Sequence, residues 1–139
     1  LHSLLPYMPR KLGGSNRAAQ SLFQLGKLAH LHGASAIIEK DLASELLAEE
    51  LDADTLLILT SVEKVSLNKD TDNETLLDTV SVDDANKYIA ENQFAAGSML
   101  PKIEAAVSFA SKGSGHRTII TDIAHARDGY REKTGTIIK

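Results

Sequence analysis

The sequence predicts an α/β fold with a mostly parallel sheet, and two recurring patterns lead to this prediction. Short, continuous apolar runs that are rich in β-branched residues are typical of strands buried on both faces of a sheet. Segments whose apolar residues repeat at the helical period alternate with these runs, and this alternation indicates parallel pairing. The chain has 139 residues, of which 42% are hydrophobic and 24% charged, which is enough material for one domain with a core.

The first 33 residues differ in character from the rest of the chain. They hold two of the three prolines, three of the five histidines and the neighbouring Gly13 and Gly14. We expect residues 1–16 to be irregular and a helix to run from Arg17 to Gly33, because apolar residues recur there at helical spacing. The chain starts at Leu1 without an initiator methionine, and we therefore interpret it as a piece of a larger protein.

The main predicted domain comprises residues 34–139 and opens with a strand, a helix and a second strand. Residues 34–38 are short and apolar and end in two isoleucines, which is typical of a buried strand. In residues 41–51, leucines alternate with glutamates at the helical period, which predicts a helix that packs on a sheet. Residues 55–59 form a second continuous apolar run, which we expect to be a strand ending at Thr60 and Ser61.

The middle of the chain contains an excursion and a helix. We expect the segments 62–68 and 76–82 to form a short hairpin around the polar stretch 69–74, which we interpret as a solvated loop. Ser81 precedes two aspartates and is therefore predicted to cap a helix that reaches about residue 91. Residues 93–100, rich in small side chains, are predicted to be a loop.

The last part of the chain repeats the alternation of helices and strands. Pro101 suits a first helical position, and the apolar face of residues 102–110 predicts a helix that stops near Gly113. Residues 118–121 are expected to form a third buried strand, after which Asp122 would cap a short helix. A final strand is predicted at 135–138.

Composition excludes several classes of function. Without cysteine there is no disulfide framework, zinc ribbon, iron–sulfur cluster or thiol nucleophile, and this usage fits a reducing cytoplasm. The formal charge of −4 leaves no basic excess for binding nucleic acid. No apolar run approaches the eighteen or so residues that cross a bilayer, so no membrane association is expected. His30 and His32 are two residues apart and so do not share a helix face, and we predict no metal site on the chain.

Polar residues follow each predicted strand at the edge of the sheet where ligands of α/β proteins gather. They are Lys40 and Asp41 after the first strand, Thr60 and Ser61 after the second, and Thr121 and Asp122 after the third. For the first pair, an ordinary role as a helix cap and a solvated lysine remains an alternative.

A fourth candidate is the helix start around Gly97, Ser98 and Lys102, where free amides and the helix dipole favour an anion. A cation in the first turn opposes the dipole unless a negative group compensates it, and a phosphate would do so. The alternative is an ordinary entry from a loop into a helix.

Two blocks of the sequence resemble carbamate kinases, which belong to the amino-acid kinase superfamily. The first block is residues 39–51 followed by 57–62, and the second is residues 94–106, with the expected strand, short helix and terminal strand after it. The resemblance covers residues 34–139 and corresponds to the C-terminal, nucleotide-binding half of such enzymes. It implies a three-layer αβα sandwich of the amino-acid kinase type.

The resemblance also implies an activity and a set of site residues. The activity is reversible phosphoryl transfer between ATP and carbamate, which gives ADP and carbamoyl phosphate and uses Mg²⁺, in a cytoplasmic and typically homodimeric enzyme such as those of arginine breakdown. Lys40 and Lys102 would contact the transferring phosphates, and Asp41 would hold the two lysines by charge pairing. The residues implied in nucleotide binding are Thr60, Ser61, Val62 and Val65 around the adenosine, and Ala96, Gly97, Ser98 and Met99 against the nucleotide.

The N-terminal half of the family has no clear counterpart in this sequence. Residues 12–16 only faintly resemble its glycine-rich phosphate loop, because no strand precedes them and a serine interrupts the motif. Two hypotheses follow: a carbamate kinase whose acceptor half is missing or supplied by another chain, or a truncated or degenerate paralogue that binds adenine nucleotide without catalysis. A third interpretation is an inert fragment, which neither binds nucleotide nor catalyses the reaction.

Overall fold

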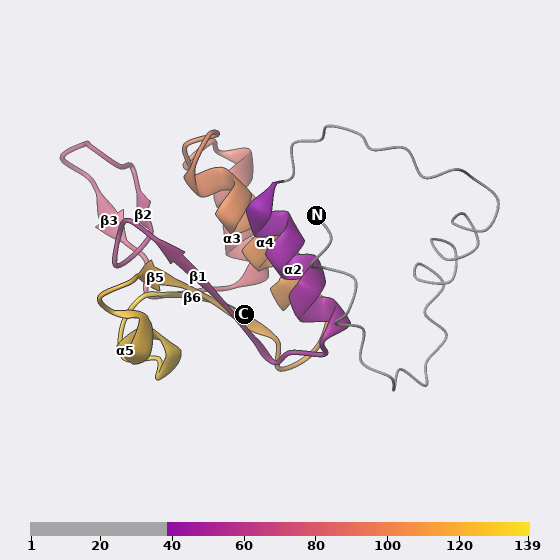
Figure 1. Ribbon diagram of the computed structural model, residues 1–139. Coiled ribbons are helices and arrows are strands. Elements are labelled where there is room, and N and C mark those ends of the chain that lie inside the picture. Colours follow the sequence, from indigo (N-terminus) through magenta and orange to yellow (C-terminus); the bar gives the residue numbers. More distant parts are fainter. Residues whose placement is uncertain (1–38) are drawn as a thin grey trace, which may run out of the picture. The chain divides into compact units, whose positions relative to one another are not determined.

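The computed structural model describes residues 39–139, which lie within one compact unit (Figure 1). The predicted helix from Arg17 and the predicted strand at 34–38 lie outside the described residues. Within the described part, no helix is long and apolar enough to cross a membrane.

Four strands form the main sheet in the order β1-β5-β6-β4. Strand β1 (Thr55–Thr60) runs parallel to β5 (Arg117–Asp122), with Thr55 opposite Arg117 and Thr60 opposite Asp122. Strand β6 (Thr136–Ile138) is antiparallel to β5 and parallel to β4 (Thr79–Val80). The prediction of an α/β fold with a mostly parallel sheet is confirmed, with β6 as the strand that reverses direction against β5.

Helices cover both faces of this sheet, which gives the three layers expected of the family (Figure 1). Strand β5 shows this alternation directly: Thr118 donates a hydrogen bond to the carbonyl of Ala106 on α4 (Met99–Ala110). The next residue, Ile119, instead faces Gly129 of α5 (Ala126–Tyr130) on the opposite side. Helices α2 (Lys40–Glu50) and α3 (Val82–Ala90) pack against α4 and complete the first helical layer.

Helix α4 is the centre of the hydrophobic core. Ile103, Ala105, Ala106 and Phe109 are all buried on it, and they pack against apolar residues of the sheet. The ring of Phe109 also stacks on His116, with 5.0 Å between the ring centroids. The small alanines let the helix approach the strands closely, as the hydrogen bond between Thr118 and Ala106 shows.

The predicted excursion in the middle of the chain is present as a separate antiparallel hairpin. It consists of β2 (Ser66–Leu67) and β3 (Thr75–Leu76), joined by a polar loop in which Asn68 and Asp70 have positive φ. The predicted cap is also present, since the Ser81 hydroxyl accepts a hydrogen bond of 3.0 Å from the Asp84 amide.

Two predicted helix starts were wrong by a few residues. Helix α4 begins at Met99, so Pro101 is its third residue and not its first. A proline is tolerated there because the first four amides of a helix have no partner within the helix. Asp122 binds the backbone amide of His125 at 2.8 Å, but α5 begins only at Ala126, so Asp122 fixes the turn that leads to the helix.

Candidate functional site

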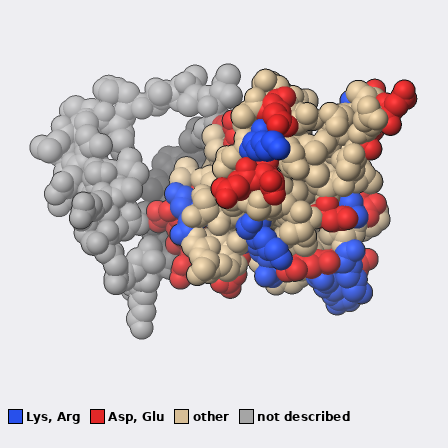
Figure 2. Space-filling model, turned by 180° about the vertical axis from the view of Figure 1, so that it is seen from behind, with Lys and Arg blue, Asp and Glu red and all other residues tan. Residues whose placement is uncertain are grey.

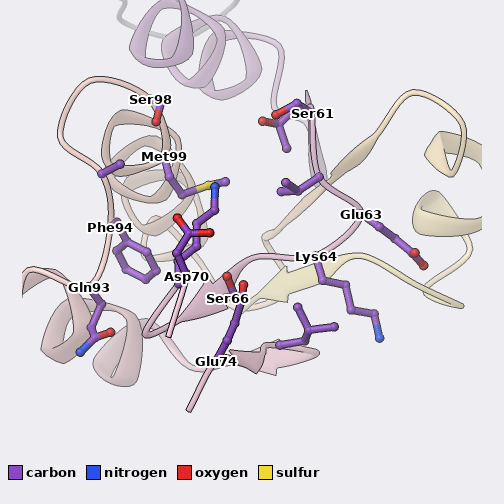
Figure 3. Close-up of a pocket in the computed structure, with 15 residues that line it drawn as sticks. Ser61, Glu63, Lys64, Ser66, Asp70, Glu74, Gln93, Phe94, Ser98 and Met99 are labelled. Atoms are coloured by element: carbon purple, nitrogen blue, oxygen red, sulfur yellow. The ribbon is translucent and has the colours of Figure 1, made fainter. Parts of the chain in front are cut away.

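A cavity of about 640 Å³ lies at the C-terminal end of β1 (Figure 3). Three segments enclose it: the loop that follows β1, the β2–β3 hairpin, and the residues that lead into α4. In Figure 3, Ser98 and Met99 lie on one side and Ser61 lies across from them. The residues that line the cavity are Thr60, Ser61, Val62, Glu63, Lys64, Ser66, Lys69, Asp70, Glu74, Leu76, Gln93, Phe94, Ala95, Ser98 and Met99.

Five of the residues that the sequence singled out for nucleotide binding lie in the wall of this cavity, namely Thr60, Ser61, Val62, Ser98 and Met99. Three others do not. Val65 is buried in the core, where its amide donates to the Thr136 hydroxyl at 2.9 Å. Ala96 and Gly97 are exposed, and the neighbouring Ala95 lines the cavity instead.

The hairpin contributes a wall that the sequence did not predict. The stretch 69–74 is exposed, as expected of a solvated loop, but Lys69, Asp70 and Glu74 within it also line the cavity. Gln93 connects this loop to the entry of α4, since its side-chain carbonyl accepts a 3.0 Å hydrogen bond from the Asn68 amide.

The amides at the start of α4 are not free, contrary to the sequence-based expectation. The amides of Ser98, Met99 and Leu100 all donate to the carbonyl of Ala95, at 3.2, 3.1 and 3.0 Å. The Ser98 side chain makes no capping hydrogen bond. The loop into the helix is therefore held by one carbonyl, and the Ser98 hydroxyl lies at the cavity.

A cluster of three charged residues joins the starts of α2 and α4. The Asp41 carboxylate accepts hydrogen bonds through the same oxygen, Oδ2, from Lys102 Nζ at 2.9 Å and from Lys40 Nζ at 3.2 Å. Asp41 and Lys102 are only 6% and 8% exposed, whereas the Lys40 side chain is 76% exposed and also lies 4.0 Å from Glu39. The pair at the centre of the cluster is thus buried, and its third member reaches solvent.

The charges of this cluster determine its protonation. Burial alone would raise the pKa of Asp41, but the hydrogen bonds from Lys102 and Lys40 outweigh it and hold that pKa below its ordinary value. The hydrogen bond to Asp41 raises the pKa of Lys40. Asp41 is therefore the negative group that the lysine in the first turn of α4 requires. It makes no helix-capping bond, because the N-cap position belongs to Glu39.

Helix α4 contributes one residue to the cavity wall and one to the charged cluster. Lys40, Asp41 and Lys102 do not line the cavity, but Met99 does, and Lys102 follows it by three residues, about 4.5 Å along the axis at the ordinary helical rise. The third strand end takes no part in the cavity, since Thr121 is buried towards α5 and Asp122 binds His125.

Charges on the remaining surface are mixed. On the face in Figure 2, acidic and basic side chains of the described residues are interspersed over the surface. Among residues 39–139, no group of three or more histidine or acidic side chains is arranged to hold a metal ion.

Comparison with known proteins relates these features to a family. Residues 18–122 match the amino acid kinase family. The carbamate kinase-like protein YqeA of Escherichia coli strain K12 is 54% identical over 109 residues, which are 78% of this chain and 35% of that protein. Carbamate kinase 3 of Staphylococcus aureus strain USA300 is 47% identical over 107 residues, or 77% of this chain and 35% of that protein.

Solved structures agree with the sequence comparison. The fold is similar to that of a carbamate kinase from Giardia lamblia bound to AMP-PNP, with a TM-score of 0.73 and 38% identity. That similarity covers 77% of this chain and 37% of the other. The chain thus spans about a third of the length of the relatives it matches, and the resemblance to carbamate kinases seen in its sequence is confirmed. On this evidence the chain belongs to the amino acid kinase family.

Proposed function

We propose that this chain supplies the nucleotide-binding half of a carbamate kinase-like phosphotransferase, which converts ATP and carbamate to ADP and carbamoyl phosphate and back. The observation that supports this proposal most is that one helix, α4, carries both a wall of the cavity and the buried Lys102. Residues 34–139 are then the nucleotide-binding domain, in which a ligand in the cavity directs its reactive end towards the lysine cluster.

The cavity suits a nucleotide in size and in lining. Its volume of about 640 Å³ lies within the range of roughly 300–1,000 Å³ that is usual for small-molecule sites. Thr60, Ser61 and Val62 would surround the adenosine, together with the loop that reaches Val65. Four residues at the entry to α4 would lie against the rest of the nucleotide, namely Ala96, Gly97, Ser98 and Met99.

The lysine cluster suits the phosphates. Phosphoryl transfer requires mainly positioning and positive charge around the transferring group. Lys40 and Lys102 both lie within 3.2 Å of the same Asp41 oxygen, so their ammonium groups are held close together. In this proposal the two lysines contact the transferring phosphates, and Asp41 is a positioning residue that fixes them before the nucleotide binds.

Magnesium enters the proposal through the nucleotide. Mg²⁺ keeps several waters and binds substrate phosphates together with only one or two carboxylates. Since the described residues offer no cluster of three acidic or histidine ligands, the phosphates would be its main ligands, and the ion would neutralise their charge.

The described residues are not proposed to bind the phosphoryl acceptor of the reaction. Because the chain spans about a third of its relatives, a missing N-terminal half or a second chain, such as a homodimer partner, would bind carbamate or carbamoyl phosphate. The same observation favours a second candidate, a truncated or degenerate paralogue that binds adenine nucleotide without catalysis. A cytoplasmic location and a role in arginine breakdown would accompany the enzymatic alternative.

Two measurements test the proposal and separate its alternatives. Calorimetry with AMP-PNP is expected to show binding to the chain, and ATP formation from ADP and carbamoyl phosphate measures catalysis. Lys102→Ala is expected to lower turnover by about 10²-fold or more, the size typical of losing one group that stabilises transition-state charge. Lys112→Ala is the matched control, because Lys112 follows the same helix and pairs at the surface with Glu49 at 3.3 Å.

If the chain binds AMP-PNP and forms ATP, and Lys102→Ala abolishes ATP formation, the result supports the kinase. If it binds AMP-PNP but forms no ATP, the result favours the paralogue. A chain that does not bind AMP-PNP would refute both.

A further inference from the structure

A second polar cluster lies outside the lysine cluster and includes a residue of the loop that follows β1. Its members are Glu63 in the loop after β1, Asp122 at the end of β5, His125 before α5, and Thr134 before β6. Glu63 belongs to the cavity wall, but Figure 3 shows its side chain pointing away from Met99, towards the C-terminal part of the chain. Its carboxylate therefore faces the end of β5 and the start of α5.

Both oxygens of this carboxylate have partners. The Thr134 hydroxyl donates to Oε1, and Nε2 of His125 lies 4.0 Å from Oε2. The imidazole is itself fixed by Asp122, whose Oδ1 lies 2.8 Å from both the backbone amide and Nδ1 of His125. The ring therefore lies between two carboxylates that come from different parts of the chain.

We propose that His125 is a positioning residue for the nucleotide cavity, whose doubly protonated ring joins Asp122 to Glu63 and so holds the loop after β1 in its binding form. This inference rests on the proposed nucleotide binding. The chemistry of the ring supports it. When Nδ1–H donates to Asp122, the Nε2 atom of a neutral ring has no proton, so its lone pair faces the Glu63 carboxylate and the two repel each other. Protonation of Nε2 converts that contact into an attraction.

The charged groups around the ring favour its protonated form. They are Asp122 on β5, Glu63 in the loop after β1 and Asp128 on α5, and all three are acidic. The hydrogen bond with Asp122 raises the pKa of His125 above its ordinary value of 6.5, against a smaller opposite effect of burial. The link between Glu63 and His125 is thus complete below that ordinary value and is lost as pH rises through the raised pKa.

Other contacts also hold the same loop. Lys64 pairs with Asp78, and the Val65 amide donates to Thr136. Among the described contacts of this loop, the link to His125 is the one that changes near neutrality. A dependence of nucleotide affinity on pH in this range, once the titration of the nucleotide itself is subtracted, therefore reports on this link.

The test compares AMP-PNP dissociation constants of the 139-residue chain and of His125→Gln by calorimetry across pH. Phosphate titration is common to both proteins and cancels in the ratio of their constants. We expect the variant to bind about two- to fivefold more weakly at about pH 6, the range of a partly exposed ion pair, and at least as well as the wild type at about pH 9, where the neutral ring no longer attracts Glu63. Glu63→Gln keeps an acceptor for Thr134 and is expected to abolish the pH dependence in the same way.

The control is Asp128→Asn, which acts on the ring but does not line the cavity. It is expected to move the midpoint of the ratio to lower pH and to leave its size unchanged. Circular dichroism establishes that each variant is folded. A ratio that stays constant across pH would overturn the proposal and leave His125 with a merely structural role.

A second readout needs no nucleotide. The ring resonances of His125 are followed by NMR against pH, and Glu63→Gln is expected to lower the midpoint; an unchanged midpoint would overturn the bridge. If the wild-type chain binds no AMP-PNP at any pH, the proposed function fails, while the ring titration still decides whether Glu63 and His125 are coupled.

Discussion

Replacing Asp41 with alanine removes the one oxygen that two lysine ammonium groups share. Lys102 is 8% exposed and loses its 2.9 Å partner, so its charge stays buried without compensation. Removing one member of a buried pair costs about 3–5 kcal/mol in comparable cases. We take the lower end, about 3 kcal/mol, because Lys102 lies in the first turn of α4 and can turn partly towards solvent.

The assay is thermal unfolding of the chain, with the free energy of unfolding taken from urea titration. For a unit of this size, about 3 kcal/mol corresponds to a decrease in Tm of roughly 12–24 °C. The exposed partner provides the control: Lys40→Ala leaves the buried pair intact and is expected to lower Tm far less than Asp41→Ala does, because an exposed ion pair contributes little. The double variant Asp41→Leu/Lys102→Met replaces the pair by apolar side chains and is expected to recover most of the loss.

Acid adds an independent check on the same pair. The pKa of Asp41 is lowered in the folded protein, mainly by hydrogen bonds from Lys102 and Lys40 that outweigh burial. The stabilisation is therefore complete above the ordinary carboxyl pKa and is lost as pH falls through the lowered one. Two results would refute the electrostatic reasoning. One is an Asp41→Ala variant that has the same free energy of unfolding as the wild type at neutral pH. The other is a double variant that is as unstable as Asp41→Ala.

Two further substitutions test the packing that supports the site. Gly129→Ala would place a methyl group 2.9 Å from the Thr121 side chain and is expected to lower the free energy of unfolding in urea by about 1–3 kcal/mol. Its control is Gly97→Ala, whose methyl group meets no atom within 4 Å and which should leave the stability nearly unchanged. Equal effects of the two substitutions would contradict the packing argument. Thr136→Val removes the acceptor of the buried Val65 amide, with an expected cost of about 1–3 kcal/mol. Thr136→Ser should restore most of that stability, and failure to do so would assign the effect to the methyl group.

Periodicity predicted the regular elements closely. The helix expected at 41–51 is α2, Lys40–Glu50, and the strand expected at 55–59 is β1, Thr55–Thr60. Both have a single repeating apolar pattern, which local sequence expresses directly. The antiparallel direction of β6 was not predictable in the same way, because a buried strand of only three residues has no pattern that distinguishes the two directions.

The site was predictable only in part, because its members are far apart in the sequence. The sequence marked Lys102 through the conflict between its charge and the helix dipole, but its partner Asp41 is 61 residues away. The pairing of Asp41 with the two lysines was therefore expected only from the resemblance to carbamate kinases, and not from any local pattern. The hairpin wall was missed since a polar loop such as 69–74 has the same composition whether it overhangs a cavity or extends into solvent. Similarly, no local signal shows that one carbonyl, that of Ala95, accepts all three amides before Pro101.

Helix α4 connects the stability of the unit to its chemistry. Its buried residues, such as Ile103 and Phe109, form the core, while Met99 and Lys102 on the same rigid body belong to the cavity and the charged cluster. Any substitution that shifts the helix in the core also moves the ammonium group, so sequence drift in this core is restricted by the site as well as by packing. By the same linkage, a ligand held at the start of α4 stabilises the whole unit against global unfolding, and not merely the loops that touch it.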